Sequence, residues 1–143
     1  MNTISEHEIV TKLIELTNGK KIDWYYLDSD FSLYDNLNLA PRKTFQGTAA
    51  LLNEYAALND NKLRFDVDNS FYSCLSSNYL VLYVTPPSSN KEILAERMSL
   101  LLVPKTYRSI KEINNVEDLI RLHTIIKSGF PSAESIIEDI FKI

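Results

Sequence analysis

The stretch FYSCLSSNYLVLYV, residues 71–84, decides the fold of this chain. Its two halves, FYSCLS and NYLVLYV, are rich in the aromatic and β-branched residues that favour strands, and Ser77-Asn78 between them is typical of a turn. The second half is apolar at nearly every position, as expected for a strand that is buried on both faces. We therefore predict a β-hairpin whose second strand lies in the centre of a sheet.

The segment before the hairpin predicts another strand. From Lys62 onward, apolar and charged residues alternate, which indicates a half-buried strand at an edge or on the surface of the sheet; the apolar positions are Leu63, Phe65 and Val67. Asp68-Asn69 then marks a turn that leads into the hairpin. The acidic residues of this strand are expected to point toward water.

The segment after the hairpin fits two patterns. The stretch 85–90 contains two prolines, which cannot donate ladder hydrogen bonds, so we expect a surface loop there. Within residues 91–103, a capping box of Ser89 and Glu92 is compatible with a helix, whereas MSLLLV is typical of a buried strand. We favour a strand from Arg97 to Val103, ended by the proline that follows.

A helix is predicted near the N-terminal end. Ser5 and Glu8 have the spacing of a capping box, which satisfies free N–H groups at a helix start, and Asn18-Gly19 can end the helix. Apolar residues recur between them at helical spacing, at Ile9, Val10, Leu13, Ile14 and Leu16. The following stretch KIDWYYL, residues 21–27, predicts a strand with a buried face made by Ile22, Trp24 and Tyr26.

The remaining elements are a loop and three helices. Residues 27–46 are rich in Asp and Asn and lack a period, so we expect an extended loop with a short helical turn at Leu33 to Leu37. GTAALLNEYAALNDN, residues 47–61, predicts a short helix. Asn115 can cap a helix that stops at Ser128-Gly129, and Pro131 suits the first position of a last helix. The apolar stripe of that last helix consists of Ile136, Ile137, Ile140 and Phe141.

These elements predict one α+β domain over residues 1–143, with an N-terminal helix, an antiparallel sheet of four to five strands and a C-terminal helix pair. A length of 143 residues is ordinary for a single domain. The 45% of hydrophobic and 24% of charged residues are typical of globular proteins. No internal repeat or linker divides the sequence.

Composition excludes several classes of function. The formal net charge of −4 argues against a nucleic-acid partner, because phosphate neutralisation needs a basic surface. The three glycines lie too far apart for a phosphate-binding loop. A single cysteine cannot form an intramolecular disulfide, and neither a secretory signal nor a membrane-spanning run is present. We expect a cytoplasmic protein of bacterial or phage origin, without a cofactor or a membrane partner.

A short opening motif has the form helix-T-x-G-K-x-I-x-W. Its matching positions are Thr17, Gly19, Ile22 and Trp24, with Lys20 or Lys21 as the lysine, and the blocks FYSCLSSNYLVLYV and ERMSLLLV follow it. In this order the sequence resembles a group of small uncharacterised bacterial and phage proteins. The resemblance implies an N-terminal helix, an antiparallel sheet and C-terminal helices, and it implies no activity. The long insertion between Trp24 and Leu63 departs from the shared pattern.

Carboxylate pairs suggest one kind of chemistry. Asp28 with Asp30, and Asp66 with Asp68, are each two residues apart, a spacing that Mg²⁺ or Mn²⁺ sites use. Asp is also common in loops, because its side chain hydrogen-bonds nearby backbone N–H groups. We keep a metal-dependent enzyme acting on a small molecule or nucleotide as the alternative hypothesis, and we assign no catalytic or metal-binding residue.

Nucleophilic catalysis finds little support in the sequence. Cys74 lies in a predicted strand, where a small buried residue is expected. His7 falls opposite the apolar stripe of its helix and is expected to be exposed. His123 lies on such a stripe and is expected to be a core histidine that is hydrogen-bonded to backbone or to a neighbouring side chain. Neither Gly-x-Ser-x-Gly nor His-Glu-x-x-His is present.

The stretch DWYYLDSDFSLYDN, residues 23–36, is dense in aromatic rings and carboxylates. Tyrosine is enriched at protein interfaces, and the acidic residues beside it would attract a basic partner; the candidate patch consists of Tyr25, Asp28, Asp30, Phe31, Tyr34 and Asp35. The same rings could instead cover the edge of the sheet. We predict a non-enzymatic protein-binding module of the antitoxin, immunity or phage-accessory kind, whose oligomeric state the sequence leaves open.

Overall fold

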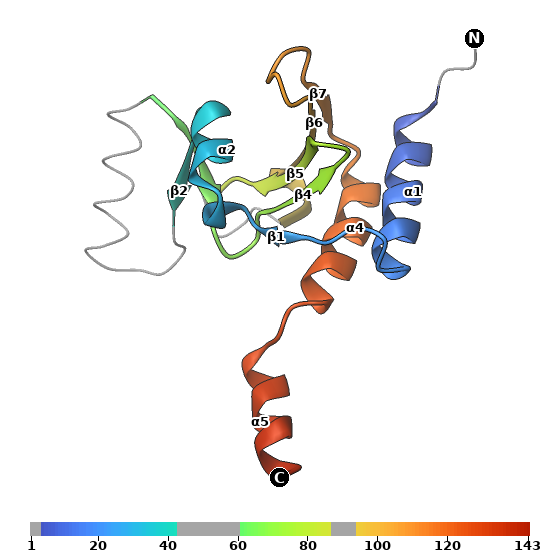
Figure 1. Ribbon diagram of the computed structural model, residues 1–143, viewed down its shortest axis with the longest axis vertical. Coiled ribbons are helices and arrows are strands. Elements are labelled where there is room, and N and C mark those ends of the chain that lie inside the picture. Colours follow the sequence, from blue (N-terminus) through green and yellow to red (C-terminus); the bar gives the residue numbers. More distant parts are fainter. Residues whose placement is uncertain (1–3, 43–60, 87–93) are drawn as a thin grey trace.

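A five-stranded antiparallel sheet lies in the middle of the molecule (Figure 1). The computed structural model describes residues 4–42, 61–86 and 94–143. The strand order is β1-β4-β5-β6-β7, and each strand runs antiparallel to its neighbours. The bounds are Tyr25–Tyr26 for β1, Phe71–Leu75 for β4, Asn78–Val84 for β5, Met98–Val103 for β6 and Lys111–Ile113 for β7.

The predicted β-hairpin is confirmed as β4 and β5. Leu75 pairs with Asn78, so the loop is Ser76-Ser77, one residue earlier than predicted. Both serines have a positive φ, of 51° and 70°, as in two-residue loops whose twist matches that of the flanking strands. The five residues from Leu80 to Val84 are all buried, which confirms that β5 is covered on both faces.

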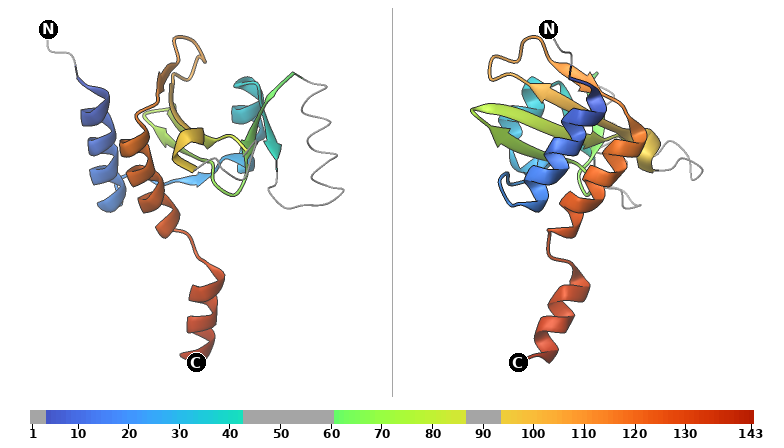
Figure 2. Two further views of the ribbon diagram at one scale, coloured as in Figure 1. Left: turned by 180° about the vertical axis from the view of Figure 1, so that it is seen from behind. Right: turned by 90° about the vertical axis from the view of Figure 1, so that its right-hand side faces the viewer.

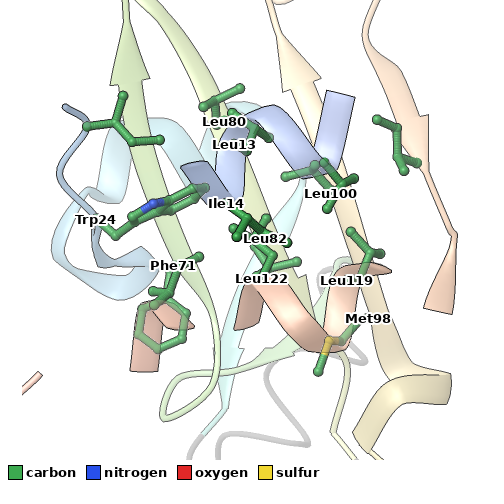
Figure 3. Packing of buried hydrophobic residues seen from close by; sticks show 14 of the residues in the cluster. Leu13, Ile14, Trp24, Phe71, Leu80, Leu82, Met98, Leu100, Leu119 and Leu122 are labelled. Atoms are coloured by element: carbon green, nitrogen blue, oxygen red, sulfur yellow. The ribbon is translucent and has the colours of Figure 1, made fainter. Parts of the chain in front are cut away.

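Two helices cover one face of the sheet (Figure 2). Helix α1 spans Glu6–Asn18 and begins at the predicted cap, where the Ser5 hydroxyl accepts from the Glu8 N–H at 3.1 Å. Helix α4 spans Val116–Ser128 and has the predicted cap Asn115. The side chains between these helices and the sheet form the larger core (Figure 3), which includes Val10, Leu13, Trp24, Phe71, Leu80, Leu82, Val84, Leu100, Leu119 and Leu122.

The segment after β1 folds against the opposite face of the sheet. It contains a 3₁₀ turn at Leu27–Ser29, helix α2 at Phe31–Asn36 and strand β2 at Leu39–Arg42. Strand β2 pairs in parallel with β3, at Leu63–Asp66. The expectation of an extended loop is therefore wrong for residues 27–42, because Leu27, Leu33 and Leu39 are buried. The short helical turn expected at Leu33 to Leu37 is present as part of α2. The second core consists of Leu27, Leu33, Leu39, Phe65, Val67, Val81, Tyr83 and Val103.

Besides β2, three described strands differ from their predictions. Strand β3 belongs to a separate two-stranded sheet with β2 and not to an edge of the main sheet. Strand β1 has only two residues, although Ile22 and Trp24 before it are buried as predicted. The sequence does not predict β7, because two of its three residues are charged and exposed. The strand favoured at Arg97 to Val103 is confirmed as β6, after a 3₁₀ turn at Leu94–Arg97.

Helix α5, at Ala133–Phe141, completes the predicted C-terminal helix pair, and the α+β class is confirmed. Its N-cap is Ser132, so Pro131 precedes the cap and is not the first helical residue. The helix predicted at 47–61 and the capping box of Ser89 and Glu92 lie outside the described residues, apart from residue 61. The assignment of one domain stays a prediction.

Leu82→Ala is expected to lower the free energy of unfolding by about 2–5 kcal/mol, because a truncated side chain leaves a cavity where Leu82 is fully buried. Denaturant unfolding followed by the fluorescence of Trp24, the single tryptophan, measures the change. Leu63→Ala is the control, since Leu63 is 49% exposed and should lose less than about 1 kcal/mol. Equal losses in the two variants would contradict the place of Leu82 in the core.

Candidate functional site

The candidate patch is built on the 3₁₀ turn and on α2. Asp30 caps α2, since its carboxylate accepts from the Leu33 N–H at 3.0 Å. The Ser29 hydroxyl donates to the carbonyl of Tyr26 at 2.6 Å and closes the turn before it. Leu33 is buried beneath α2. This anchoring leaves Asp28 and Phe31 exposed to solvent.

A chain of contacting aromatic rings connects the candidate patch to the second core. The Phe31 side chain is 66% exposed and meets the ring of Tyr34 edge-on, at 5.5 Å between centroids. Tyr34 is half-buried and packs in turn on the buried ring of Phe65, at 5.4 Å. Phe31 is thus a solvent-facing ring held by its neighbours, while Tyr34 also belongs to the core.

The carboxylates of the patch gather around Tyr34. Burial raises the pKa of Tyr34 above its ordinary value of 10.0, and the charges of Asp28, Asp35 and Asp30 raise that pKa further. Asp35 forms an ion pair with Lys62, which lies just before β3. Asp28, Asp30, Phe31, Tyr34 and Asp35 therefore lie together, and we call them the acidic corner.

Tyr25, the remaining candidate, lies on the sheet beside the acidic corner. It is 47% exposed, and its ring lies 5.4 Å from that of Tyr72 on the neighbouring strand β4. Burial raises the pKa of Tyr72, the Ser29 hydroxyl lowers it, and Asp30 raises it again. Tyr72 thus links Tyr25 to the acidic corner, so the structure brings all six predicted residues to one side of the molecule.

The same face of the sheet carries side chains that the sequence reading missed. Cys74 pairs with Tyr79 across the hairpin, and the ring of Tyr79 stacks on that of Tyr107 at 6.1 Å. Period-two alternation could have placed Tyr72, Cys74 and Tyr79 on one face, once the register of the hairpin was known. We call this surface the tyrosine face, which consists of Tyr25, Tyr72, Cys74, Tyr79 and Tyr107.

The expectation that Cys74 is buried is wrong, because its strand position points to the side of the sheet that α1 and α4 do not cover, where it is exposed. Partial burial of the thiol and the charge of Asp30 both raise the pKa of Cys74 above 9.0. The thiolate is the nucleophilic form. The protonated thiol at neutral pH therefore disfavours Cys74 as a nucleophile.

The second Asp pair, Asp66 and Asp68, stabilises a turn. Asp66 is buried, contrary to the expectation that it points toward water. Its carboxylate accepts from the Asp68 N–H at 3.0 Å and from the Asn69 amide at 2.8 Å, which fixes the turn into the hairpin. Within the described ranges, no three His, Cys, Asp or Glu side chains gather as a metal site would need.

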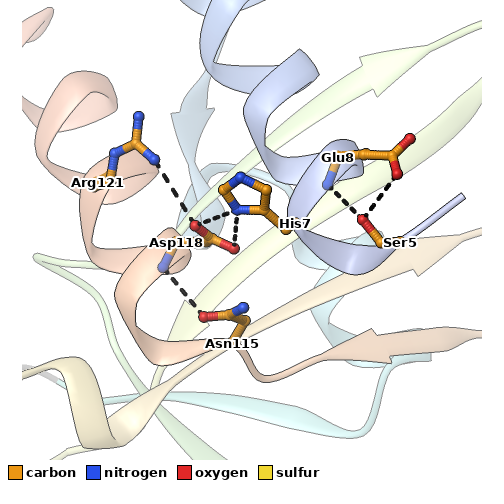
Figure 4. Close-up of polar contacts among 6 residues, drawn as sticks. All are labelled: Ser5, His7, Glu8, Asn115, Asp118 and Arg121. Carbon is orange, nitrogen blue, oxygen red and sulfur yellow. Dashed lines mark hydrogen bonds and ion pairs between the residues drawn. The ribbon is translucent and has the colours of Figure 1, made fainter.

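His7 is exposed as predicted, yet it makes a contact that the sequence did not indicate (Figure 4). Its Nδ1 lies 2.9 Å from both carboxylate oxygens of Asp118, which is buried at the start of α4. Arg121 approaches the same carboxylate at 3.8 Å. A buried carboxylate needs such partners. This contact ties the first turn of α1 to the first turn of α4.

His123 is a core histidine, as predicted. It is buried, and its Nε2 lies 2.9 Å from the carbonyl of Asn69. Burial lowers the pKa of His123 below 6.5, and this effect outweighs the hydrogen bond to Asn69, which raises the pKa. The charge of Lys127 lowers the pKa as well, and that of Asp66 raises it. The ring is therefore neutral at neutral pH and donates from Nε2 to the carbonyl.

Comparison of this chain with known protein families, with curated proteins and with solved structures yields no match. The resemblance carried by Thr17, Gly19, Ile22 and Trp24 therefore stays a prediction. Among the described helices, none combines the length and the apolar character needed to cross a bilayer. The candidate surface must be interpreted from its own geometry and chemistry.

The buried neutral His123 predicts a loss of stability in mild acid. Its pKa is about 6.5 in the unfolded chain and lower in the fold, so the unfolded state binds more protons as the pH falls below 6.5, and the free energy of unfolding decreases. Urea unfolding measured from about pH 7 to about pH 5, above most carboxyl pKa values, tests this.

His123→Gln removes the titrating group and keeps a side-chain N–H donor. It should therefore give a shallower pH dependence than the wild type over the same range, whatever its stability at neutral pH. Identical slopes for the two proteins would contradict a neutral buried histidine.

Proposed function

We propose that this protein is a non-enzymatic protein-binding module. It binds a basic segment of another protein through the tyrosine face and the acidic corner. The observation that carries the proposal is the exposure of Phe31 and Tyr25, at 66% and 47%, beside Asp28 and Asp30. An exposed aromatic ring held in place by its neighbours binds a partner at low cost in side-chain entropy.

Charge supports a basic partner. Three carboxylates surround Tyr34, and only that of Asp35 is paired with a lysine in the described contacts of the acidic corner. Carboxylates beside an aromatic surface attract Lys and Arg side chains and increase the rate of association. Arg and Lys can also stack on exposed aromatic rings.

The tyrosine hydroxyls supply polar contacts. Burial raises the pKa of Tyr72 and of Tyr79 above 10.0, and Asp30 adds to both shifts. Both hydroxyls are therefore protonated at neutral pH; that of Tyr79 is bonded to Tyr107, whereas that of Tyr72 can donate to a carbonyl group of a bound chain. Aromatic area, negative charge and hydroxyl donors together suit a short Arg- or Lys-containing segment.

Antitoxin, immunity and phage-accessory proteins are the roles that we propose for such a module. The metal-dependent alternative has less support, because the carboxylates of Asp30 and Asp66 already accept hydrogen bonds from backbone N–H groups. A binding role uses the exposed parts of the acidic corner without displacing those bonds.

Selection from a random peptide display library tests the proposed function. Peptides bound by the wild-type protein are expected to be enriched in Arg and Lys and to bind less tightly as the salt concentration rises. Asp28→Asn/Asp30→Asn/Phe31→Ala should weaken the selected peptides about tenfold or more, which corresponds to roughly 1.4 kcal/mol. Asn replaces Asp30 because it caps a helix equally well.

The matched control is Glu15→Gln/Glu117→Gln/Ile120→Ala, which removes two carboxylates and one partly exposed apolar side chain from α1 and α4. It should bind as the wild type does. Thermal unfolding checks that both variants are folded. Selected peptides without basic enrichment, or equal binding by both variants, would contradict the proposal.

A further inference from the structure

Helix α5 differs from α1, α2 and α4, because no extensive contact joins it to another described helix or strand. Figures 1 and 2 show it projecting away from the three layers formed by α1 with α4, the sheet, and α2 with β2. None of its residues is buried. Its large apolar side chains are all more than half exposed: Ile136, Ile137, Ile140 and Phe141, followed by Ile143.

The helix is nevertheless well defined by its own sequence. Ser132 and Ser135 form a reciprocal capping box at its start, with the Ser135 N–H bound to the Ser132 hydroxyl at 3.2 Å. A helix of 9 residues is not stable alone in water, since helices shorter than about 12 residues are marginal and depend on packing. Its apolar face therefore needs a partner surface.

An apolar groove at the opposite end of the molecule offers such a surface. It has a volume of about 450 Å³ and lies between the first half of α1 and the β4–β5 hairpin. Leu75, on its wall, is 43% exposed. The groove is lined mainly by aliphatic side chains, among them Ile9, Leu13, Leu75, Leu80 and Leu102.

Charges on the helix and on the groove are complementary. Three of the four charged residues of the segment 133–143 are acidic, namely Glu134, Glu138 and Asp139. The groove is bordered by the exposed Lys111, and Lys105 and Arg108 are exposed in the loop that contributes Pro104 and Ser109 to its lining. An acidic amphipathic helix thus matches an apolar groove with a basic rim.

In this structure, α5 does not lie in the groove of its own chain, since it projects away from the layers (Figures 1 and 2). Helices α1 and α4 run in parallel, since His7 contacts Asp118 at their starts. Helix α5 follows the far end of α4 after residues 129–132, which span at most about 14 Å. The groove lies at Ile9 and Leu13 of α1, whereas α5 continues from the last residues of α4.

We propose that α5 of one chain docks into this groove of a second copy, and that the second copy returns its own α5 in the same way. Groove and helix lie at opposite ends of each chain, so two antiparallel chains can exchange both helices around a twofold axis. This reciprocal dimer can be tested separately from the proposed binding of a basic segment, because the groove shares only Tyr79 with the tyrosine face and no residue with the acidic corner.

The mass of the full chain in solution, measured by light scattering after size exclusion, tests the proposal. The wild type is expected at twice the mass of one chain. Ile140→Asp on α5 and Leu75→Asp in the groove should each give the mass of one chain. The circular dichroism spectrum of each variant should differ from that of the wild type only by the helical signal of α5. Both side chains are exposed, so neither substitution disturbs the core.

Mixing these two monomeric variants is the decisive step, because the mixture contains one intact α5 and one intact groove. A heterodimer should form in the mixture although neither variant dimerises alone. Lys111→Glu should weaken the wild-type dimer, and adding Glu138→Lys in the same chain should restore part of the affinity. A monomeric wild type, a dimer that survives Leu75→Asp, or the absence of association in the mixture would overturn the proposal.

Discussion

The burial of β5 on both faces is the constraint on which the rest of the structure depends. Its residues Leu80 to Val84 are buried in succession, so alternate side chains point to opposite sides of the sheet and each side requires a cover. Helices α1 and α4 supply one cover, over Leu80, Leu82 and Val84. The 3₁₀ turn, α2 and the β2–β3 pair supply the other, over Val81 and Tyr83. Two cores thus share one strand.

The unequal size of the two covers explains where the acidic corner and the tyrosine face lie. The second cover is small, so the tyrosines of β1, β4 and the start of β5 remain partly exposed next to it. Its exposed side is acidic because Asp30 caps α2, Asp28 lies in the 3₁₀ turn before it, and Asp35 lies within α2. The acidic corner is therefore held at the border of the sheet by the buried Leu27 and Leu33. Helix α5 lies outside both covers, with its apolar side chains exposed.

The sequence predicts what local patterns determine. Ser5, Asn115 and the apolar period of their helices give α1 and α4, and the hairpin follows from the apolar run of β5. The proximity of the residues in the candidate patch was also predictable, because they are close in sequence, whereas its role as a binding site stays a prediction. Non-local contacts were not predictable: the parallel pairing of Leu39 with Leu63, the burial of Asp66 in a turn, and the contact of His7 with Asp118. The exposure of Cys74 was not predicted, because its position in a strand does not show which parts of the sheet other elements leave uncovered.

Native-state hydrogen exchange tests the central claim most directly, since it reports the stability of each backbone hydrogen bond. If β5 holds both covers, its amides from Leu80 to Val84 exchange only by global unfolding, and the amides of Tyr34 and Leu37 in and after α2 are protected as part of the same folded unit. The account is contradicted if the amides of α1 and α4 outlast those of β5, or if those of α2 exchange at the rate of an unstructured peptide. In either case, the acidic corner would not be held on the sheet.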